Sequence, residues 1–186
     1  MTALIIYGHP DTKGHCPYIL DQVKSQLNHK KIKFKSINLY KENYDPILHE
    51  NELYTAGNRE ISKQNKTYQE MIKNSDLQIY IYPIWWGSMP AILKGFFDKV
   101  FTSHFAFKYV NALPLGLLKD KKAIIFATCG APSFYYKYLF RGPIWIIKKG
   151  ILGFCGIKSK MYLLGKSTKL TENRKEKIKK MVKKAI

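Results

Sequence analysis

The chain has 186 residues, of which 46% are hydrophobic and 24% are charged, and its net charge is +19 at pH 7. This balance is that of a globular protein, so we expect residues 1–186 to form a single domain and we exclude an intrinsically disordered chain. The N-terminus lacks signal-peptide features, and no apolar run reaches the roughly 20 residues of a membrane span. We therefore expect a cytoplasmic protein without a transmembrane segment.

The basic excess, 32 Lys and Arg against 13 Asp and Glu, permits two interpretations. The lysines are either solvated side chains scattered over the surface, or they attract an anionic partner such as nucleic acid, a cofactor or a membrane surface. They concentrate only near the C-terminus, on a predicted helix whose Ile178, Met181 and Val182 are expected to face the core. A packed terminal helix with a solvated basic face is the interpretation we favour, so no nucleic-acid partner is expected.

Strand and helix patterns alternate along the chain without linkers or repeats. In chain order, the predicted elements are a strand at 4–7, a helix at 18–27, a strand at 32–39, a loop at 43–59, a helix at 60–74, a strand at 77–82, a helix from Pro90, a strand at 123–127, an aromatic-rich loop at 133–142, a helix at 144–154, a strand at 161–164 and a helix at 171–184.

This alternation predicts an α/β protein with a parallel sheet, right-handed crossovers and helices on both faces. Ligands of such sheets bind beyond the carboxyl ends of the strands, where the strand order reverses. The segments after the first, third and fourth strands are therefore expected to converge on one site.

The first of these segments, residues 8–16, is rich in turn-forming residues and leads directly into a helix. Its backbone N–H groups are expected to bind an anion such as phosphate, with His9, Thr12 and Lys13 as further donors. An ordinary surface turn remains the alternative. Neither a GxxxxGK[ST] loop nor a GxGxxG fingerprint occurs, which disfavours a nucleoside triphosphate and a two-glycine dinucleotide site.

The second and third segments carry aromatic and small polar residues. Trp85 and Trp86 are adjacent in a strand-to-helix turn and cannot both enter one core, so at least one is expected to line a cleft for a flat aromatic ligand. Simple packing of both indoles onto the next helix is the alternative. In the third segment, Thr128 and Gly130 are suited to donate hydrogen bonds, and Cys129 is favoured as a small strand-end residue over a catalytic thiol.

Other chemistries find little support in the sequence. The five histidines include no HxH or HxxxH pair, the three cysteines are expected to be free thiols, and no metal site is predicted. The absence of GxSxG also disfavours a Ser-His-Asp hydrolase.

Several segments match those of a known family. The main ones are Gly8-His9-Pro10, Tyr44-Asp45-Pro46-Ile47-Leu48, Phe105-Ala106-Phe107-Lys108-Tyr109, Gly150-Ile151-Leu152-Gly153-Phe154-Cys155-Gly156 and, above all, the stretch from Pro83 to Phe101. Through these the chain resembles the NAD(P)H:quinone reductase branch of the flavodoxin-like flavoproteins. The resemblance implies a three-layer flavodoxin-like fold with a five-stranded parallel sheet in the order 2-1-3-4-5.

The resemblance also implies roles for individual residues. In the family, the flavin phosphate is bound by residues matching His9 and the turn of Lys13, Gly14, His15 and Cys16. The isoalloxazine ring is covered by residues matching Pro83, Ile84, Trp85, Trp86 and Gly87, and its pyrimidine side is held by those matching Thr128, Cys129, Gly130 and Ala131. Tyr136 matches a tyrosine that stabilises charge on the reduced ring, whereas Phe107, Tyr109 and Phe154 match residues that reach into the partner's cleft in a homodimer.

The function so implied is that of an oxidoreductase, a flavin-dependent quinone reductase. It is expected to use FMN, or alternatively FAD, and to pass two electrons from NAD(P)H to quinones or similar flat acceptors by a ping-pong mechanism. Two alternatives remain open. One is a regulatory flavodoxin-like subunit that docks on a membrane transporter or nucleic acid, and the other is an electron carrier like flavodoxin itself.

Overall fold

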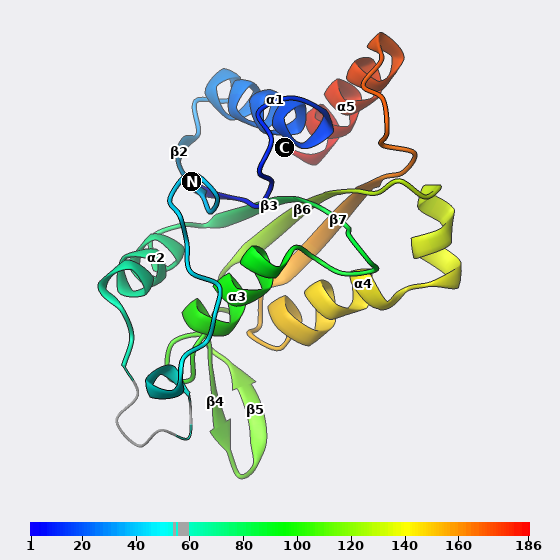
Figure 1. Cartoon of the computed structure of the whole chain (residues 1–186). Coiled ribbons are helices and arrows are strands. Elements are labelled where there is room, and N and C mark those ends of the chain that lie inside the picture. Colours follow the sequence, from blue (N-terminus) through cyan, green and yellow to red (C-terminus); the bar gives the residue numbers. More distant parts are fainter. Residues whose placement is uncertain (54, 56–59) are drawn as a thin grey trace.

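The structure, a computed structural model, describes residues 1–53, 55 and 60–186 (Figure 1). Its centre is a five-stranded parallel sheet in the order β2-β1-β3-β6-β7, which confirms the predicted order of the five sheet strands. The strands are β1 (Thr2–Tyr7), β2 (Lys33–Asn38), β3 (Leu77–Pro83), β6 (Lys122–Thr128) and β7 (Lys158–Leu164). The order reverses at β1, between β2 and β3, and places β1, β3 and β6 side by side.

Helices cover both faces of the sheet and form the predicted three layers (Figure 1). One face carries α1 (His15–His29) and α5 (Glu172–Ala185), which pack against each other. The other face carries α2 (Lys63–Lys73), α3 (Ala91–Val100), α4 (Gly142–Trp145) and the π-helical η3 (Ile146–Gly153).

Alternation of side chains along the strands divides the interior into two cores. On β1, Ala3, Ile5 and Tyr7 belong to the core beneath α1 and α5, whereas Leu4 and Ile6 belong to the core beneath α2 and α3. All seven residues of β3 are buried, as expected for a central strand covered on both faces. The sheet is therefore a rigid platform from which the loops at its carboxyl edge project.

Lysines stand on the two edge strands of the sheet. Lys33 and Lys35 are exposed on β2, and Lys158 and Lys160 are exposed on β7. The inner strands β1 and β3 carry no charged residue along their length.

Three local predictions were wrong or incomplete. A hairpin of β4 (Phe107–Val110) and β5 (Leu113–Gly116) was not predicted, because its strands are short and largely exposed and lack a clear alternation. The predicted loop at 133–142 contains the π-helical η2 (Tyr135–Leu139), and the predicted helix at 144–154 consists of α4 and η3. In the predicted loop at 43–59, residues 50–52 form the 3-10 turn η1 (Glu50–Glu52), and residues 54 and 56–59 lie outside the described residues.

Lys99, a buried lysine on α3, binds residues 45–52, which include η1. Lys99 Nζ lies 3.0 Å from Glu52 Oε2 and 3.2 Å from Asp45 Oδ2, and it donates a 2.7 Å hydrogen bond to the Ile47 carbonyl. On the same helix, a Cβ added to Gly95 would lie 2.2 Å from the Pro46 carbonyl oxygen, so the segment crosses α3 in direct backbone contact. Residues 45–52 are thus held against the helix by charge and by shape.

Candidate functional site

The three segments named from the sequence meet in one cavity of about 310 Å³ at the carboxyl ends of β1, β3 and β6. Hydrogen bonds between the backbones join the segments. The Gly8 N–H donates to the Ile81 carbonyl at 3.0 Å, and the Ile84 N–H donates to the Thr128 carbonyl at 2.7 Å. The cavity is lined by His9, Asp11, Lys13, Gly14, His15, Cys16, Pro83, Ile84, Trp85, Thr128, Cys129, Gly130, Ser167 and Thr168.

The first segment presents the N-terminus of α1 to this cavity. Gly14 is the N-cap at φ 110°, a conformation that favours glycine, and no side chain caps the helix. The N–H groups of the first turn are therefore free of a side-chain acceptor, and the helix dipole adds positive potential. This geometry, with Lys13 beside it in the lining, suits a phosphate group.

His15 is a second sign of an anion at this position. The side chain is only 7% exposed, and its Nε2 is buried without a hydrogen-bond partner among the described residues. Burial, and then the positive charge of Arg174, lower the pKa of His15, so the ring is neutral at pH 7. A buried ring nitrogen without a partner is costly, and a phosphate oxygen bound at the helix terminus is an acceptor of suitable chemistry.

The second segment places its two tryptophans differently with respect to the cavity. Trp86 and Gly87 both have positive φ, 48° and 71°, in a tight turn closed by reciprocal 2.9 Å hydrogen bonds between the backbones of Trp85 and Ser88. The Trp85 ring lies 5.8 Å from the His9 ring and lines the cavity, whereas Trp86 is fully exposed. Trp86 and Gly87 were predicted to cover a ligand, but within one chain neither lines the cavity.

The third segment contributes hydroxyl and backbone groups. Thr128 Oγ1 lies 3.3 Å from Cys16 Sγ, and the Cys129 N–H donates to the Leu164 carbonyl at 2.9 Å. Burial raises the pKa of Cys16 to about 12 and that of Cys129 to about 11, so both thiols stay protonated at neutral pH. This favours the interpretation of Cys129 as a small strand-end residue over a thiol nucleophile.

Two further predicted residues, Ala131 and Tyr136, do not line the cavity. Ala131 follows Gly130, and its carbonyl accepts a hydrogen bond from the Lys166 N–H at 3.0 Å. Tyr136 stands on η2 with its ring 5.2 Å from that of Tyr135. Burial raises the pKa of Tyr136 above its usual value, so its hydroxyl remains a hydrogen-bond donor through the neutral range.

The sequence reasoning missed Ser167 and Thr168, which follow β7 and complete the cavity wall. The sequence could have indicated them, because β7 is the neighbour of β6 in the sheet. The residues that follow each parallel strand lie at the same edge of the sheet. The segment is tied to the third one, since the Ser167 N–H donates to the Cys129 carbonyl at 2.9 Å. Asp11 was also missed, and its backbone N–H donates to His9 Nδ1 at 3.0 Å.

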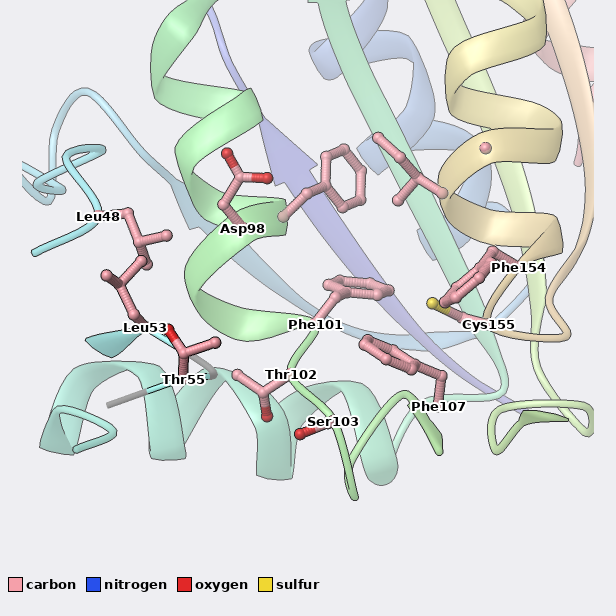
Figure 2. A pocket seen from close by; sticks show the side chains of 13 residues that line it. Leu48, Leu53, Thr55, Asp98, Phe101, Thr102, Ser103, Phe107, Phe154 and Cys155 are labelled. Atoms are coloured by element: carbon pink, nitrogen blue, oxygen red, sulfur yellow. The ribbon is translucent and has the colours of Figure 1, made fainter. Parts of the chain in front are cut away.

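A second, more open cavity of about 470 Å³ lies between α3, η3 and the side chains of Leu48, Leu53 and Thr55 (Figure 2). Phe107 and Phe154 meet there edge to face, with ring centroids 4.9 Å apart, and Tyr109 adjoins Phe107 at 5.8 Å. Figure 2 shows the rings of Phe101, Phe107 and Phe154 gathered on one side, opposite Leu48 and Leu53. None of Phe107, Tyr109 and Phe154 lines the first cavity of its own chain.

Two features bear on other chemistries. Among the described residues, no group of three or more His, Cys, Asp or Glu side chains is arranged to bind a metal ion. None of the helices formed by these residues combines the length and hydropathy needed to cross a bilayer.

Comparison with known proteins agrees with this architecture. The family described as having a flavodoxin-like fold matches residues 1–186. The chain is 34% identical over 164 residues to an NAD(P)H oxidoreductase of Haemophilus influenzae, covering 86% of this chain and 80% of that protein. It is 30% identical over 178 residues to NAD(P)H dehydrogenase [quinone] 1 of Cavia porcellus, covering 84% of this chain but only 65% of that enzyme.

Solved structures share the whole fold. The crystal structure of Smu.1420 from Streptococcus mutans is 30% identical, with a TM-score of 0.86, and the match covers 99% of this chain and all of that one. An FMN-dependent NADH-azoreductase from Bacillus anthracis, solved in complex with FMN, is 16% identical with a TM-score of 0.75, and 99% of each chain is covered. At that identity the second likeness concerns the fold alone.

Proposed function

The chain belongs to the flavodoxin-like NAD(P)H oxidoreductase family, and from this premise we propose that it reduces quinones or similar flat acceptors through a bound flavin. One observation carries the proposal. An uncapped helix N-terminus, the indole of Trp85 and a hydroxyl-bearing strand end line a single cavity where the strand order reverses. These are the partners that a phosphate, a planar ring and the polar edge of that ring require.

The proposed binding mode follows the lining of the cavity. The backbone N–H groups at Gly14 to Cys16, with Lys13 and His15, bind the phosphate, and Trp85 lies against the ring system. Thr128 and Gly130 hydrogen-bond its polar edge. When bound, the flavin supplies two-electron transfer from NAD(P)H to the acceptor, and the protein orients the reactants and excludes water.

FMN is the flavin we propose, with FAD as the alternative. The matching azoreductase fold was solved with FMN, and in both cases the phosphate next to the ribityl chain would occupy the same helix terminus. NADH and NADPH remain equal candidates for the electron donor.

We also propose that a homodimer completes the substrate site. Phe107 and Phe154 line the second cavity of their own chain, Tyr109 adjoins Phe107, and none of the three lines the first cavity. In a dimer these three residues are available to wall the partner's flavin site, where they would stack on flat acceptors and favour low specificity.

The direct test is to purify the chain, identify any released flavin by its spectrum and mass, and measure menadione reduction with NADH and with NADPH. We expect a yellow protein and parallel lines in double-reciprocal plots, because a donor and an acceptor that share one site react in turn. A colourless protein that takes up neither FMN nor FAD would refute the proposal.

Replacing Tyr136 with phenylalanine should lower kcat for menadione about 10-fold. The proposed role of its hydroxyl is to donate a hydrogen bond that stabilises charge on the reduced ring, and water can replace part of that interaction. Stopped-flow measurement of flavin reduction checks this result. Tyr138→Phe is the matched control, because Tyr138 is an exposed tyrosine on the same helix, and equal rates in the two variants would contradict the assignment.

A further inference from the structure

His15 stands at the first position of α1, next to the N-cap Gly14, and is one of the residues that line the first cavity. The side chain is 7% exposed, and its Nε2 has no hydrogen-bond partner among the residues that the structure describes. The N–H groups of the same helical turn also lack a side-chain cap. An anion at this terminus would therefore meet an unsatisfied imidazole ring as well as unsatisfied backbone donors.

The surroundings of His15 disfavour a proton on its ring. Burial opposes the charged form, and the guanidinium of Arg174, on α5, repels a second positive charge. The helix dipole adds positive potential at the same place. The other titratable residues on the elements around the ring are His9, Asp11, Lys13, Cys16 and Tyr18. The one carboxylate in the cavity lining, that of Asp11, is exposed to water, so the ring of the flavin-free protein is a neutral base without a close counter-charge.

His9, the other histidine of the cavity, is fixed as a neutral donor. Its Nδ1 accepts a 3.0 Å hydrogen bond from the Asp11 N–H, so the proton of the neutral ring is assigned to Nε2. A proton on Nδ1 would set two donors against each other and break this bond. The described residues form no hydrogen bond to the ring of His15, so His15 can gain a proton without such a loss.

We propose that His15 gains a proton when FMN binds, so that the affinity of the protein for FMN increases as the pH falls from about 8 to about 6. The phosphate monoester of FMN, a dianion at neutral pH, supplies the counter-charge that the ring lacks. This inference rests on the proposed flavin site and concerns how that site is regulated.

The sign of the effect follows from the two states of the ring. Burial, and then Arg174, lower the pKa of His15 in the flavin-free protein. A dianion within about 4–6 Å favours the imidazolium and raises that pKa in the complex. Between the two pKa values the complex holds one more proton than its separate partners, and the affinity changes by up to about tenfold per pH unit. Below about pH 6 the phosphate of free FMN is itself protonated, which ends the gain.

The first test is fluorescence titration of the flavin-free 186-residue protein with FMN and with riboflavin, between about pH 6 and about pH 8 at constant ionic strength. Riboflavin has the same ring and ribityl chain but no phosphate, so its affinity should not change with pH over this range. We expect FMN to bind at least about fivefold more tightly at the lower pH. An FMN affinity that is constant, or that falls toward pH 6, would overturn the inference and leave the proposed function standing, whereas binding of neither flavin would refute both.

Calorimetry counts the proton directly. FMN is titrated into the flavin-free protein at neutral pH in two buffers that differ in their enthalpy of ionisation, and the difference in heat gives the protons exchanged. We expect uptake approaching one proton for each FMN bound, and none for riboflavin. Zero uptake, or release of a proton, would contradict the proposal.

His15→Phe keeps a ring of similar size that cannot take up a proton. This variant should lose the pH dependence and the proton uptake and should bind FMN about 10-fold more weakly at the lower pH. Its affinity for riboflavin should stay nearly unchanged, whereas a merely structural role would weaken both flavins alike. His29→Phe, at the exposed other end of α1, is the matched control and should behave as the parent does. Equal pH dependence in the parent and in His15→Phe would overturn the proposal.

Two further variants separate His15 from its neighbours. Arg174→Gln removes the repelling charge, so the pH dependence should move to higher pH; an unshifted dependence would contradict the proposal. This variant leaves the cavity lining in place and serves as the test should circular dichroism show that His15→Phe does not fold. His9→Asn keeps an acceptor for the Asp11 N–H and should retain the pH dependence while binding FMN more weakly. Loss of the dependence in His9→Asn, with its retention in His15→Phe, would assign the proton to His9 and overturn the proposal.

Discussion

Replacing Gly165 with valine should weaken flavin binding about 100-fold. Gly165 follows β7 beneath the third segment of the cavity, and a Cβ at this position would lie 2.2 Å from the Ser133 nitrogen and 2.7 Å from the Ala131 carbonyl oxygen. Backbone atoms cannot move aside as a flexible side chain can, so the added carbons would displace the loop that holds Thr128 and Gly130 in position. Such overpacking costs up to about 3 kcal/mol, which corresponds to a factor on the order of 100 in affinity.

Fluorescence titration of the flavin-free protein with FMN measures this effect. Gly165→Ala should give a smaller loss than valine, and circular dichroism of each variant separates a displaced loop from a failure to fold. Gly142→Val is the control, because nothing lies within 4 Å of a Cβ at Gly142. Unaltered FMN affinity in a folded Gly165→Val protein would show that the third segment does not contribute to the flavin site.

Replacing Lys99 with methionine should lower the free energy of unfolding by roughly 3 kcal/mol. The substitution keeps most of the aliphatic stem but leaves the buried Glu52 carboxylate without its cation, and breaking a buried ion pair on one side is strongly destabilising. The Ile47 carbonyl would also lose its donor. Urea unfolding monitored by circular dichroism measures the change.

Two further variants test that explanation. Adding Glu52→Gln to Lys99→Met should restore part of the stability, because the unpaired charge is then gone. Lys94→Met removes a lysine from an exposed pair on the same helix, 2.7 Å from Asp98, and should change stability by less than about 1 kcal/mol. If Lys94→Met and Lys99→Met were equally destabilising, the buried pair would have no special role.

The ion-pair cluster around Lys99 also makes the stability of the fold decrease at low pH. A hydrogen bond from the Ile47 N–H, then one from His49 and the Lys99 ammonium, lower the pKa of Asp45 to about 2. Because this folded-state pKa lies below the unfolded value, the stabilisation is fully present above about pH 4 and is lost as the pH falls towards 2.

The sheet and the meeting of its loops were predictable from sequence because both depend on chain-long patterns. Buried strands such as β3 are continuously apolar, and the alternation of strands with helices fixes the direction of every strand and therefore the edge at which the loops gather. Ser167 and Thr168 obey the same rule, and they were missed only because the rule was applied to three strands rather than four.

What escaped prediction depends on local geometry. The direction of Trp86 is set by the positive φ values of one turn, which adjacent tryptophans in a sequence do not reveal. The π-helical turns of η2 and η3 differ from an α-helix by one residue in hydrogen-bond spacing, and the periodicity of apolar residues is too coarse to separate the two. The hairpin of β4 and β5 is formed by antiparallel pairing of two short strands, and the sequence pattern of their exposed residues does not indicate this pairing.

The lysines on β2 and β7 limit how copies of the protein can associate. An unpaired strand edge is a template for another strand, and rows of like charge along both outer strands of the sheet oppose the joining of two such edges. A continuous sheet running through two molecules is therefore disfavoured, as is the fibrous stacking to which bare edges are prone. Subunits that do pair must meet through helices and loops, which leaves the platform of each one intact.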